Sequence, residues 1–249
     1  MLSGLAARYR RARFALWAAG VRVRLRRQGI AVEISAGPGL RFATLPFVEL
    51  DPYSPGRGGT LTIALGRDVR LGRGLTLDVR AGTDNRLVLG DRVVCQSWCR
   101  VQLHGGAITL GDDVHLRDSS QLKTKSAVDV GPRTVLSRNV IVHATAGVTI
   151  GADCGIGERT SLIDSDHTLA GDGGNYLEAP LRAAPIVLGD GVAVGANCVI
   201  LKGTRMGDGS ALAAGAVAGG LAVEPGWLAG GTPARPIRAL GVGSSGGER

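Results

Sequence analysis

Large side chains are scarce in this sequence, and it has no long hydrophobic run. Aromatic residues make up only 4% of the 249 residues, which is too few for a conventional globular core. The apolar run from Phe14 to Val21 is much shorter than the roughly 20 residues that cross a bilayer. Arginines between Arg22 and Arg27 follow it directly, where the cleavage site of a signal peptide would lie. The sequence therefore argues against a membrane-spanning chain and against secretion.

Acidic residues are absent from the first 27 positions, which hold eight arginines. The whole chain has 29 basic and 21 acidic residues, so the remainder is neutral once these eight are set aside. The basic character belongs to an N-terminal arm and does not indicate a body that binds nucleic acid. Apolar residues recur in this arm at roughly helical spacing, at Leu2, Leu5, Tyr9, Leu16 and Trp17. Two interpretations stay open: a solvated helix that caps the fold, and an interfacial helix that holds the protein against anionic lipid.

Glycine, by contrast, is abundant, with 40 residues and no collagen triplet, which indicates many tight turns. Residues 188–217 divide into the sixes LGDGVA, VGANCV, ILKGTR, MGDGSA and LAAGAV. An aliphatic residue opens each six, and the fifth place takes Val, Cys, Thr, Ser or Ala. The same phase recurs upstream in sets of three: Leu65, Leu71, Leu77; Leu89, Cys95, Val101; Leu110, Leu116, Leu122; Val130, Leu136, Val142; and Ile150, Ile156, Leu162.

A period of six fits neither an α-helix nor the alternation of a simple strand. It fits a short strand followed by a turn, and three such units make one triangular coil. Coils stack about 4.8 Å apart through parallel pairing, with the opening aliphatic residues inside. One coil cannot bury its own core, but a stack can. The sequence therefore predicts an all-β fold, a parallel β-helix of hexapeptide repeats that follows a short helical, basic arm.

The four cysteines fit the same phase. Cys95 stands at the first place of its six, and Cys99, Cys154 and Cys198 stand at the fifth. We expect them to be small buried apolar residues. No second cysteine pair accompanies Cys95 and Cys99, so a zinc site is not favoured. Unpaired buried thiols are typical of a reduced, cytoplasmic protein.

Residues from about 60 to 240 resemble the hexapeptide-repeat acyltransferases, in particular the sugar and polysaccharide O-acetyltransferases related to maltose and galactoside acetyltransferases. The best match runs from Pro185 to Arg238 and begins PIVLGDGVAVGANCVILKGTRMGDG. The family pattern is P-I-x-I-G-D-x-V-W-I-G-x-N-x-x-I-L-x-G-V-x-I-G, and it closes with G-N-P-A-x-x-I-R, where this chain has GTPARPIR. The resemblance implies left-handed coils, acetyl-CoA as the acyl donor and a homotrimer whose sites lie between subunits.

The repeat and the resemblance together predict the domain organisation. We expect an N-terminal basic arm and lead-in at 1–58 and the left-handed β-helix at 59–240. A loop insert at 168–185 interrupts the repeat; it is too long and polar to be a mere turn, and loops of this kind favour function. A flexible C-terminal tail is expected at 241–249.

The catalytic candidate is His167, at the corner where the insert leaves the repeat. The resemblance implies that this histidine is the general base, which takes the proton of an acceptor hydroxyl as the oxygen attacks the thioester. Asp164 and Asp166 flank it and are candidates to orient the imidazole or to bind substrate hydroxyls. Because side chains alternate along a strand, we expect only one of the two to point with the neighbours of His167. His143, roughly one coil earlier, is a weaker candidate for the acceptor groove.

The resemblance also implies contacts to acyl-CoA. It places Ala196 and Ala214 where backbone groups meet the pantetheine arm, and Arg235 and Arg238 where basic side chains meet the nucleotide phosphates. The histidines are too widely spaced in the sequence for a zinc site, so no metal is expected. Three departures from the pattern leave acyl size and acceptor open: Ala193 replaces a tryptophan, Gly219-Gly220 replaces Thr-Lys, and Ser137 replaces a sugar-contacting asparagine.

The reaction that the resemblance implies is transfer of an acetyl or small acyl group from acyl-CoA to a hydroxyl. The acceptor class is a sugar, glycan, glycolipid or glycosylated metabolite. Two alternatives stay open, which are N-acetylation of an amino sugar nucleotide and a β-helix scaffold without catalysis. The expected location is the cytoplasm, with the inner face of the membrane as a peripheral partner of the basic arm.

Overall fold

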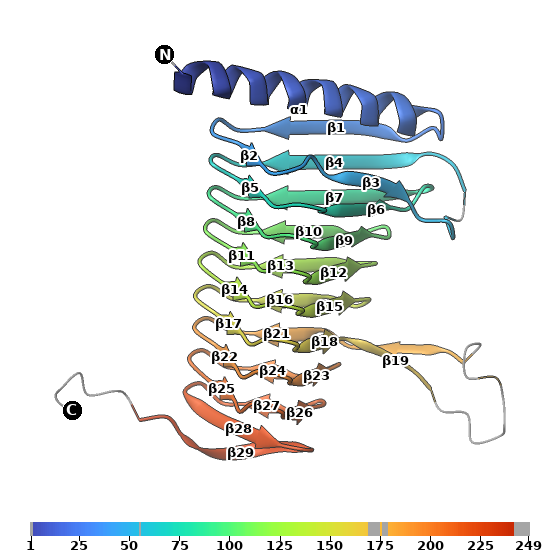
Figure 1. Ribbon diagram of the computed structural model, residues 1–249. Helices are drawn as coiled ribbons and strands as arrows, with labels where there is room; N and C mark the ends of the chain where they lie inside the picture. The colour runs from blue at the N-terminus through green and yellow to red at the C-terminus, as the bar shows by residue number, and fades with distance from the viewer. Residues whose placement is uncertain (1, 55, 169–174, 176–178, 242–249) are drawn as a thin grey trace.

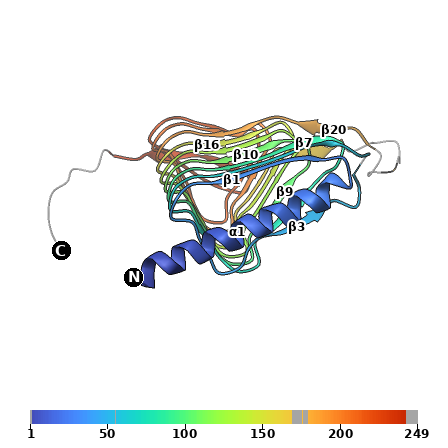
Figure 2. The same cartoon turned by 90° about the horizontal axis from the view of Figure 1, so that it is seen from above.

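The chain winds into a triangular prism of stacked coils, and one long helix lies across the first coil (Figure 1). This computed structural model describes residues 2–54, 56–168, 175 and 179–241. Seen from above, the chain passes around the triangle anticlockwise as it descends from the helix (Figures 1 and 2), so the coils are left-handed. The described residues contain eight complete coils of three strands each and the start of a ninth.

The helix α1 (Leu2–Arg26) precedes the first coil, and the strands follow in threes. Coils one to three are β1 (Ala31–Ala36), β2 (Arg41–Phe42), β3 (Phe47–Leu50); β4 (Gly59–Leu65), β5 (Arg70–Leu71), β6 (Thr76–Val79); and β7 (Thr83–Leu89), β8 (Val94–Cys95), β9 (Arg100–Leu103). Coils four to six are β10 (Ala107–Leu110), β11 (His115–Leu116), β12 (Gln121–Thr124); β13 (Ala127–Val130), β14 (Val135–Leu136), β15 (Ile141–Ala144); and β16 (Val148–Ile150), β17 (Gly155–Ile156), β18 (Ser161–Ile163). A hairpin of β19 (Ser165–His167) and β20 (Leu181–Ala183) comes next. The last coils are β21 (Ile186–Leu188), β22 (Ala193–Val194), β23 (Val199–Leu201); β24 (Arg205–Met206), β25 (Ala211–Leu212), β26 (Val217–Ala218); and β27 (Ala222–Val223), β28 (Trp227–Gly231), with β29 (Ala234–Ala239) at the end.

Each face of the prism is one sheet of parallel strands. Sheet A runs from β1 through β4 and β7 to β27, sheet B from β2 through β5 and β8 to β28, and sheet C from β3 through β6 and β9 to β26. The last strand, β29, pairs with β28 in the antiparallel direction and ends sheet B. Each coil therefore contributes one strand to every face, and equivalent residues of successive coils lie above one another.

The interior confirms the six-residue phase that the sequence predicts. All the residues predicted to open a six are buried, from Leu65, at 8% exposed, to Leu212. The fifth places are buried as well, including Cys154, Cys198, Thr204 and Ala216. The core is thus a column of aliphatic side chains with small residues packed in its corners.

Two different constraints act at the corners. A Cβ atom on Gly157 would lie 2.5 Å from the backbone nitrogen of Ala196 in the next coil, so glycine is required there because the coils approach closely. The middle of these turns adopts positive φ, and glycine occupies this position in most turns of the late coils. In the earlier coils Arg92 and Asp113 stand at this position, with φ of 57° and 58°. Their side chains form an ion pair of 2.7 Å between stacked turns, which links the two turns.

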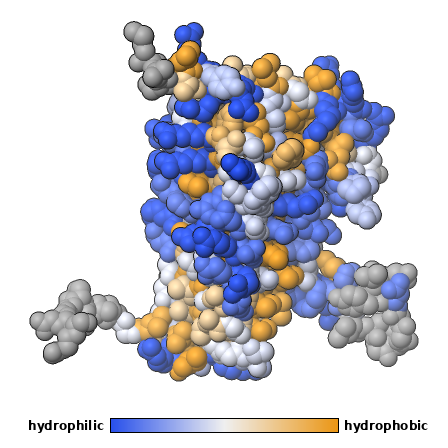
Figure 3. Space-filling view, viewed as in Figure 1, coloured by the Kyte–Doolittle hydropathy of each residue, from blue (hydrophilic) through white to orange (hydrophobic). Residues whose placement is uncertain are grey.

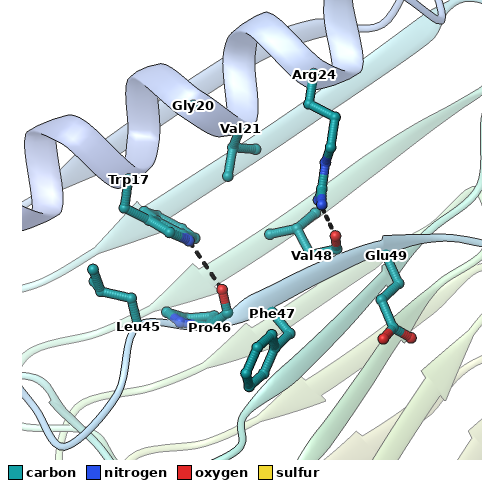
Figure 4. Close-up of a pocket in the computed structure, with 9 residues that line it drawn as sticks. All are labelled: Trp17, Gly20, Val21, Arg24, Leu45, Pro46, Phe47, Val48 and Glu49. Atoms are coloured by element: carbon teal, nitrogen blue, oxygen red, sulfur yellow. Dashed lines mark hydrogen bonds between the residues drawn. The ribbon is translucent and has the colours of Figure 1, made fainter.

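Helix α1 closes the open end of the prism above the first coil (Figure 4). Its buried side chains Ala18, Val21 and Leu25 belong to the hydrophobic core. Trp17 Nε1 donates a hydrogen bond of 2.9 Å to the carbonyl of Pro46, and Arg24 donates to the carbonyl of Val48, the latter in the edge strand β3. The helix therefore donates hydrogen bonds to backbone carbonyls that would otherwise be unpaired at this end of the prism.

The β-helix begins earlier than the expected residue 59. Ala31 of β1 pairs with Thr60 of β4, so residues 31–50 form the first coil and are not a lead-in. The opening places of the first coil are Ala36, Phe42 and Val48, six residues apart, and they pair with Leu65, Leu71 and Leu77 of the second coil. The prediction missed this coil because alanine and phenylalanine stand where the later coils have large aliphatic residues. Half of the expected insert at 168–185, and all of the expected tail at 241–249 except residue 241, lie outside the described residues.

Hydrophilic side chains cover much of the middle coils on the face drawn in Figure 3, and hydrophobic ones are more frequent toward both ends. In the described part of the chain, no helix combines the length and the apolar character of a membrane-crossing segment.

Candidate functional site

The hairpin of β19 and β20 leaves the prism at the corner between sheets C and A, between coils six and seven (Figure 2). Its two strands are antiparallel, and His167 lies opposite Leu181. Thr168 continues the pairing, because its backbone nitrogen donates to the carbonyl of Pro180 at 3.0 Å. The repeat predicted the place where the chain departs, and the hairpin gives that departure a defined geometry.

His167 is half-buried at the end of β19. Its Nδ1 lies 2.8 Å from the carbonyl oxygen of Ala179. A carbonyl oxygen only accepts, so Nδ1 carries the hydrogen, and Nε2 is the ring nitrogen with the lone pair when the imidazole is neutral. The hairpin therefore selects the tautomer of His167 and fixes the plane of its ring.

Asp164 lies beneath the hairpin with no exposed surface. Its carboxylate oxygens accept hydrogen bonds of 2.7–2.9 Å from the backbone nitrogens of Thr145, Ala146 and Gly147. Its backbone carbonyl also accepts from the nitrogen of Ala184 at 3.0 Å, where the chain returns from the hairpin. Asp164 thus ties the turn of the previous coil to both ends of the insert.

Asp166 is exposed on β19, opposite Arg182 of β20. Its carboxylate forms an ion pair with the ammonium of Lys202, which follows β23 in the next coil. The two aspartates therefore have different surroundings, one inside the fold and one on the surface beside the hairpin. Sequence reasoning missed Lys202, because only the stacking of coils brings it to this corner.

His143 lies on β15, one coil before the strand that leads to the hairpin. Burial, with Lys123 as the next cause, lowers the pKa of His143 below its ordinary value. Its Nε2 is buried and has no hydrogen-bond partner among the described residues. His143 is thus a half-buried imidazole near the site.

Ala196 and Ala214 occupy a different corner of the prism, between sheets B and C. Each stands in the turn that follows a short strand of sheet B, one coil apart. The backbone nitrogen of Gly215 donates to the carbonyl of Ala196 at 2.9 Å, so the two turns are stacked. A Cβ on Gly195 would lie 2.4 Å from the nitrogen of Ala214, which shows how closely these turns approach.

Arg235 and Arg238 lie on the reversed strand β29, and both are exposed. Residues three apart on a regular strand point to opposite faces. Here the pairing shifts between Leu228 and Ala229, so Arg235 lies opposite Gly230 and Arg238 opposite Leu228. Because Ala229 faces the core, this irregularity brings both arginines to the outer face of sheet B.

The described residues contain no group of three or more His, Cys, Asp or Glu side chains that could hold a metal ion. The four cysteines are unpaired and buried. Burial raises the pKa of the Cys99 thiol to about 11, so a reactive thiolate is not available there.

Within one chain, His167 and the residues expected to contact acyl-CoA lie at different corners of the prism. His167 lies at the corner between sheets C and A, whereas Ala196 and Ala214 lie at the corner between sheets B and C. One side of the triangle separates the two corners, which is about six extended residues or roughly 20 Å. A site that uses both sets of residues therefore favours the juxtaposition of two chains.

No protein-family model matches the sequence. A hexapeptide-repeat-containing acetyltransferase of Vibrio cholerae O1 biovar eltor, solved with acetyl-coenzyme A, is 31% identical over 53% of this chain and 70% of that chain, with a TM-score of 0.46. The polySia-specific acetyltransferase NeuO is 23% identical over 85% of this chain and 81% of that chain, with a TM-score of 0.47. A tetrahydropyridine-dicarboxylate N-acetyltransferase of Staphylococcus aureus strain bovine RF122 / ET3-1 is 44% identical over 59 residues, which is 24% of this chain.

The chain spans about a quarter of the length of the curated relatives it matches, 24% for the one from Staphylococcus aureus. It is 31% identical to the Vibrio cholerae acetyltransferase in an alignment that covers 70% of that protein. Its own coils carry the hexapeptide phase from Leu65 to Leu212. On the strength of this identity and this repeat, the chain belongs to the hexapeptide-repeat acetyltransferases.

Proposed function

We propose that this protein transfers an acetyl or small acyl group from acyl-CoA to a hydroxyl of a carbohydrate-type acceptor, with His167 as the general base. The observation that carries the proposal is the contact of 2.8 Å between Nδ1 of His167 and the carbonyl of Ala179. It gives the neutral imidazole a basic Nε2 at the corner where the insert leaves the coil. A positioned base of this kind contributes about 10²- to 10⁴-fold to a proton transfer.

The proposed reaction needs one proton acceptor and no covalent enzyme intermediate. Nε2 of His167 takes the proton of the acceptor hydroxyl while the oxygen attacks the thioester carbonyl. A backbone N–H near the corner stabilises the oxyanion of the tetrahedral intermediate. The carbon–sulfur bond then breaks, and the imidazolium returns its proton to the leaving thiolate of CoA. The products are an ester and free CoA.

Acyl-CoA in this proposal lies between two chains of a homotrimer. The separation of His167 from Ala196 and Ala214 on one chain supports a shared site, because the neighbouring copy supplies the missing corner. The outward face that Arg235 and Arg238 share supports their role at the CoA phosphates, since guanidinium groups pair well with phosphate. The reaction is proposed to occur in the cytoplasm, where we expect the acyl-CoA donor to be found.

Asp164 and Asp166 have separate roles in this proposal. Asp164 positions the hairpin from below through its bonds to the turn at Thr145, and it does not touch substrate. Asp166, which is exposed and paired with Lys202, is the aspartate within reach of an acceptor hydroxyl.

The acceptor is proposed to be a sugar, a glycan, a glycolipid or a glycosylated metabolite. Acyl transfer to an amino group is the alternative, with an amino sugar nucleotide as acceptor. The Staphylococcus aureus relatives are N-acetyltransferases, and an N-acyltransferase from Bacillus cereus solved with dTDP-4-amino-4,6-dideoxyglucose and coenzyme A is 14% identical with a TM-score of 0.40. The 44% identity to the Staphylococcus aureus relative over 59 residues supports testing amino acceptors beside hydroxyl acceptors.

The test is acceptor-dependent release of CoA from acetyl-CoA by wild type and by His167→Ala. We expect the variant to lose about 10²- to 10⁴-fold in turnover and to bind acetyl-CoA nearly as well as wild type. His115→Ala, a histidine of sheet B outside the site, is the matched control. Normal turnover in His167→Ala would show that another group is the base, and a wild type inactive on every acceptor would favour the scaffold. A base-labile ester in the product supports oxygen transfer, and an amide supports the alternative.

A further inference from the structure

Helix α1 has a second apolar face that its packing on the β-helix does not use. Leucine, tyrosine, alanine and valine side chains recur on it at alternating intervals of four and three residues, which places them on one side of a helix. The large ones are all exposed: Leu5 67%, Tyr9 63%, Leu16 74% and Val23 61%. This outward stripe, made of Leu5, Tyr9, Ala12, Leu16, Ala19 and Val23, is directed away from the first coil.

A separate, inward face of α1 makes the contacts with the first coil, and the outward stripe takes no part in them. Ala18, Val21 and Leu25 are buried against the first coil, and Phe14 and Trp17 pack at its margin. At about 100° per residue, this inward set lies almost opposite the outward stripe. A helix that served only to cap the prism would carry polar residues there.

Arginines line both edges of the outward stripe. Arg8 and Arg26 fall on one flank and Arg13 on the other at the same angular spacing, and all three are exposed. The first acidic residue of the chain is Glu33, beyond the end of the helix. On its single flank, Arg13 also packs over the Phe42 ring of the first coil, 5.4 Å from the ring centroid. An apolar stripe flanked by arginines, with no negative charge on the helix, is the pattern of a helix that binds an anionic interface.

The position of α1 allows the whole stripe to meet a plane at once. The helix lies flat across the end of the prism, and no other described part of the chain rises above it in Figure 1. We propose that α1 docks this end of the protein on an anionic lipid surface, with the outward stripe in the boundary between headgroups and acyl chains. The axis of the β-helix then stands away from that surface.

Charge complementarity selects a lipid surface over a second copy of the chain. If two copies joined through this stripe, the arginines along one α1 would face the arginines along the other, with no acidic partner on either helix. Anionic headgroups would instead neutralise the arginines that flank the stripe, and each basic residue near such a surface contributes to binding. This docking is separate from the proposed acyl transfer, which takes place at the hairpin several coils away.

The test is flotation of the full-length protein with phosphatidylcholine vesicles, with and without phosphatidylglycerol. We expect binding only when phosphatidylglycerol is present, and we expect added salt to weaken it. Leu16→Ser should lower the affinity about tenfold, whereas Ile237→Ser, at a residue 56% exposed at the other end of the prism, should leave it unchanged. Arg8→Gln and Arg26→Gln should each lower the affinity about fivefold, with Arg138→Gln as the control.

Three results would overturn the docking proposal. They are absence of binding to anionic vesicles, equal binding by wild type and Leu16→Ser, and lipid-free self-association that Leu16→Ser abolishes in analytical ultracentrifugation. The last result would identify a second copy as the occupant. All substituted side chains are exposed, so thermal unfolding should be unchanged, and turnover with a water-soluble acceptor should stay at the wild-type level. Loss of vesicle binding is therefore distinguishable from failure of the proposed reaction.

Discussion

The carboxylate of Asp164 is buried beneath the hairpin, and Asp164→Asn tests whether it supports the site or takes part in the chemistry. One oxygen, Oδ2, accepts from Thr145, Ala146 and Gly147, and Oδ1 accepts from Thr145 as well. An asparagine that places its carbonyl at Oδ2 keeps the 2.9 Å bond from Thr145 and the 2.7 Å bonds from Ala146 and Gly147, but loses charge assistance, chiefly in the two shorter bonds. Its NH₂ group then faces the N–H of Thr145, and no bond forms between two donors.

The magnitude of this change follows from those contacts. Losing charge assistance costs about 1 kcal/mol for each of two bonds, and a buried donor without a partner costs about 1–3 kcal/mol. The sum is roughly 3–5 kcal/mol, which lowers the melting temperature by about 10 °C in a chain of this size. Asp166→Asn, on the exposed side of the hairpin, should change the melting temperature by less than about 2 °C.

Scanning calorimetry gives the melting temperatures, and CoA release well below the transition gives turnover. We expect Asp164→Asn to be much less stable than Asp166→Asn and to keep turnover within about tenfold of wild type, as for a residue that makes no contact with the transition state. A variant with unchanged melting temperature whose turnover falls as far as that of His167→Ala would refute the supporting role. It would place Asp164 in the chemistry.

Three further predictions concern the donor, the pH and the assembly. Arg235→Ala and Arg238→Ala should each raise the KM for acetyl-CoA about tenfold with little change in turnover, because a charge-assisted bond to phosphate contributes about 1.5–3 kcal/mol; an equal effect with a short thioester that lacks the nucleotide would contradict this. The pKa of His143 is lowered in the folded protein, so its contribution to stability is complete above its ordinary pKa of 6.5 and is lost as the pH falls through the folded value. Urea unfolding should therefore show stability that declines from about pH 7 to pH 5, and His143→Gln should reduce this decline; an identical decline in the variant would be contrary evidence. Sedimentation at micromolar concentration should give the mass of three chains, and a monomer there would count against a shared site.

The core of the fold was predictable because the six-residue repeat recurs from coil to coil. The residues that open each six from Leu65 to Leu212 are all buried, and equivalent places of successive coils stack through parallel pairing. The first coil keeps the same phase at Ala36, Phe42 and Val48, but alanine and phenylalanine are not the large aliphatic residues that open most later sixes. The prediction therefore missed this coil, which the pairing of β1 with β4 reveals.

The candidate site was predictable in its position but not in its contacts. The end of the regular repeat indicated the insert, and the family resemblance made His167 beside it the catalytic candidate. The partners of Asp164 lie 17 to 19 residues earlier in the chain and bind through backbone nitrogens, so no side-chain motif could indicate them. Arg235 and Arg238 share one face because the strand pairing is irregular between Leu228 and Ala229. No sequence pattern indicates this irregularity.

The parallel stacking of coils makes the β-helix a molecular ruler. Helix α1 is fixed to the first coil and the hairpin with His167 leaves after the sixth, so the height between them is set by the number of coils. Each coil adds about 4.8 Å, which places the two roughly 25 Å apart along the axis. Insertion or removal of one whole middle coil would change this height by one step while leaving both ends intact. The reach of the site from the capped end is thus quantised, and coil number is the variable that adjusts it.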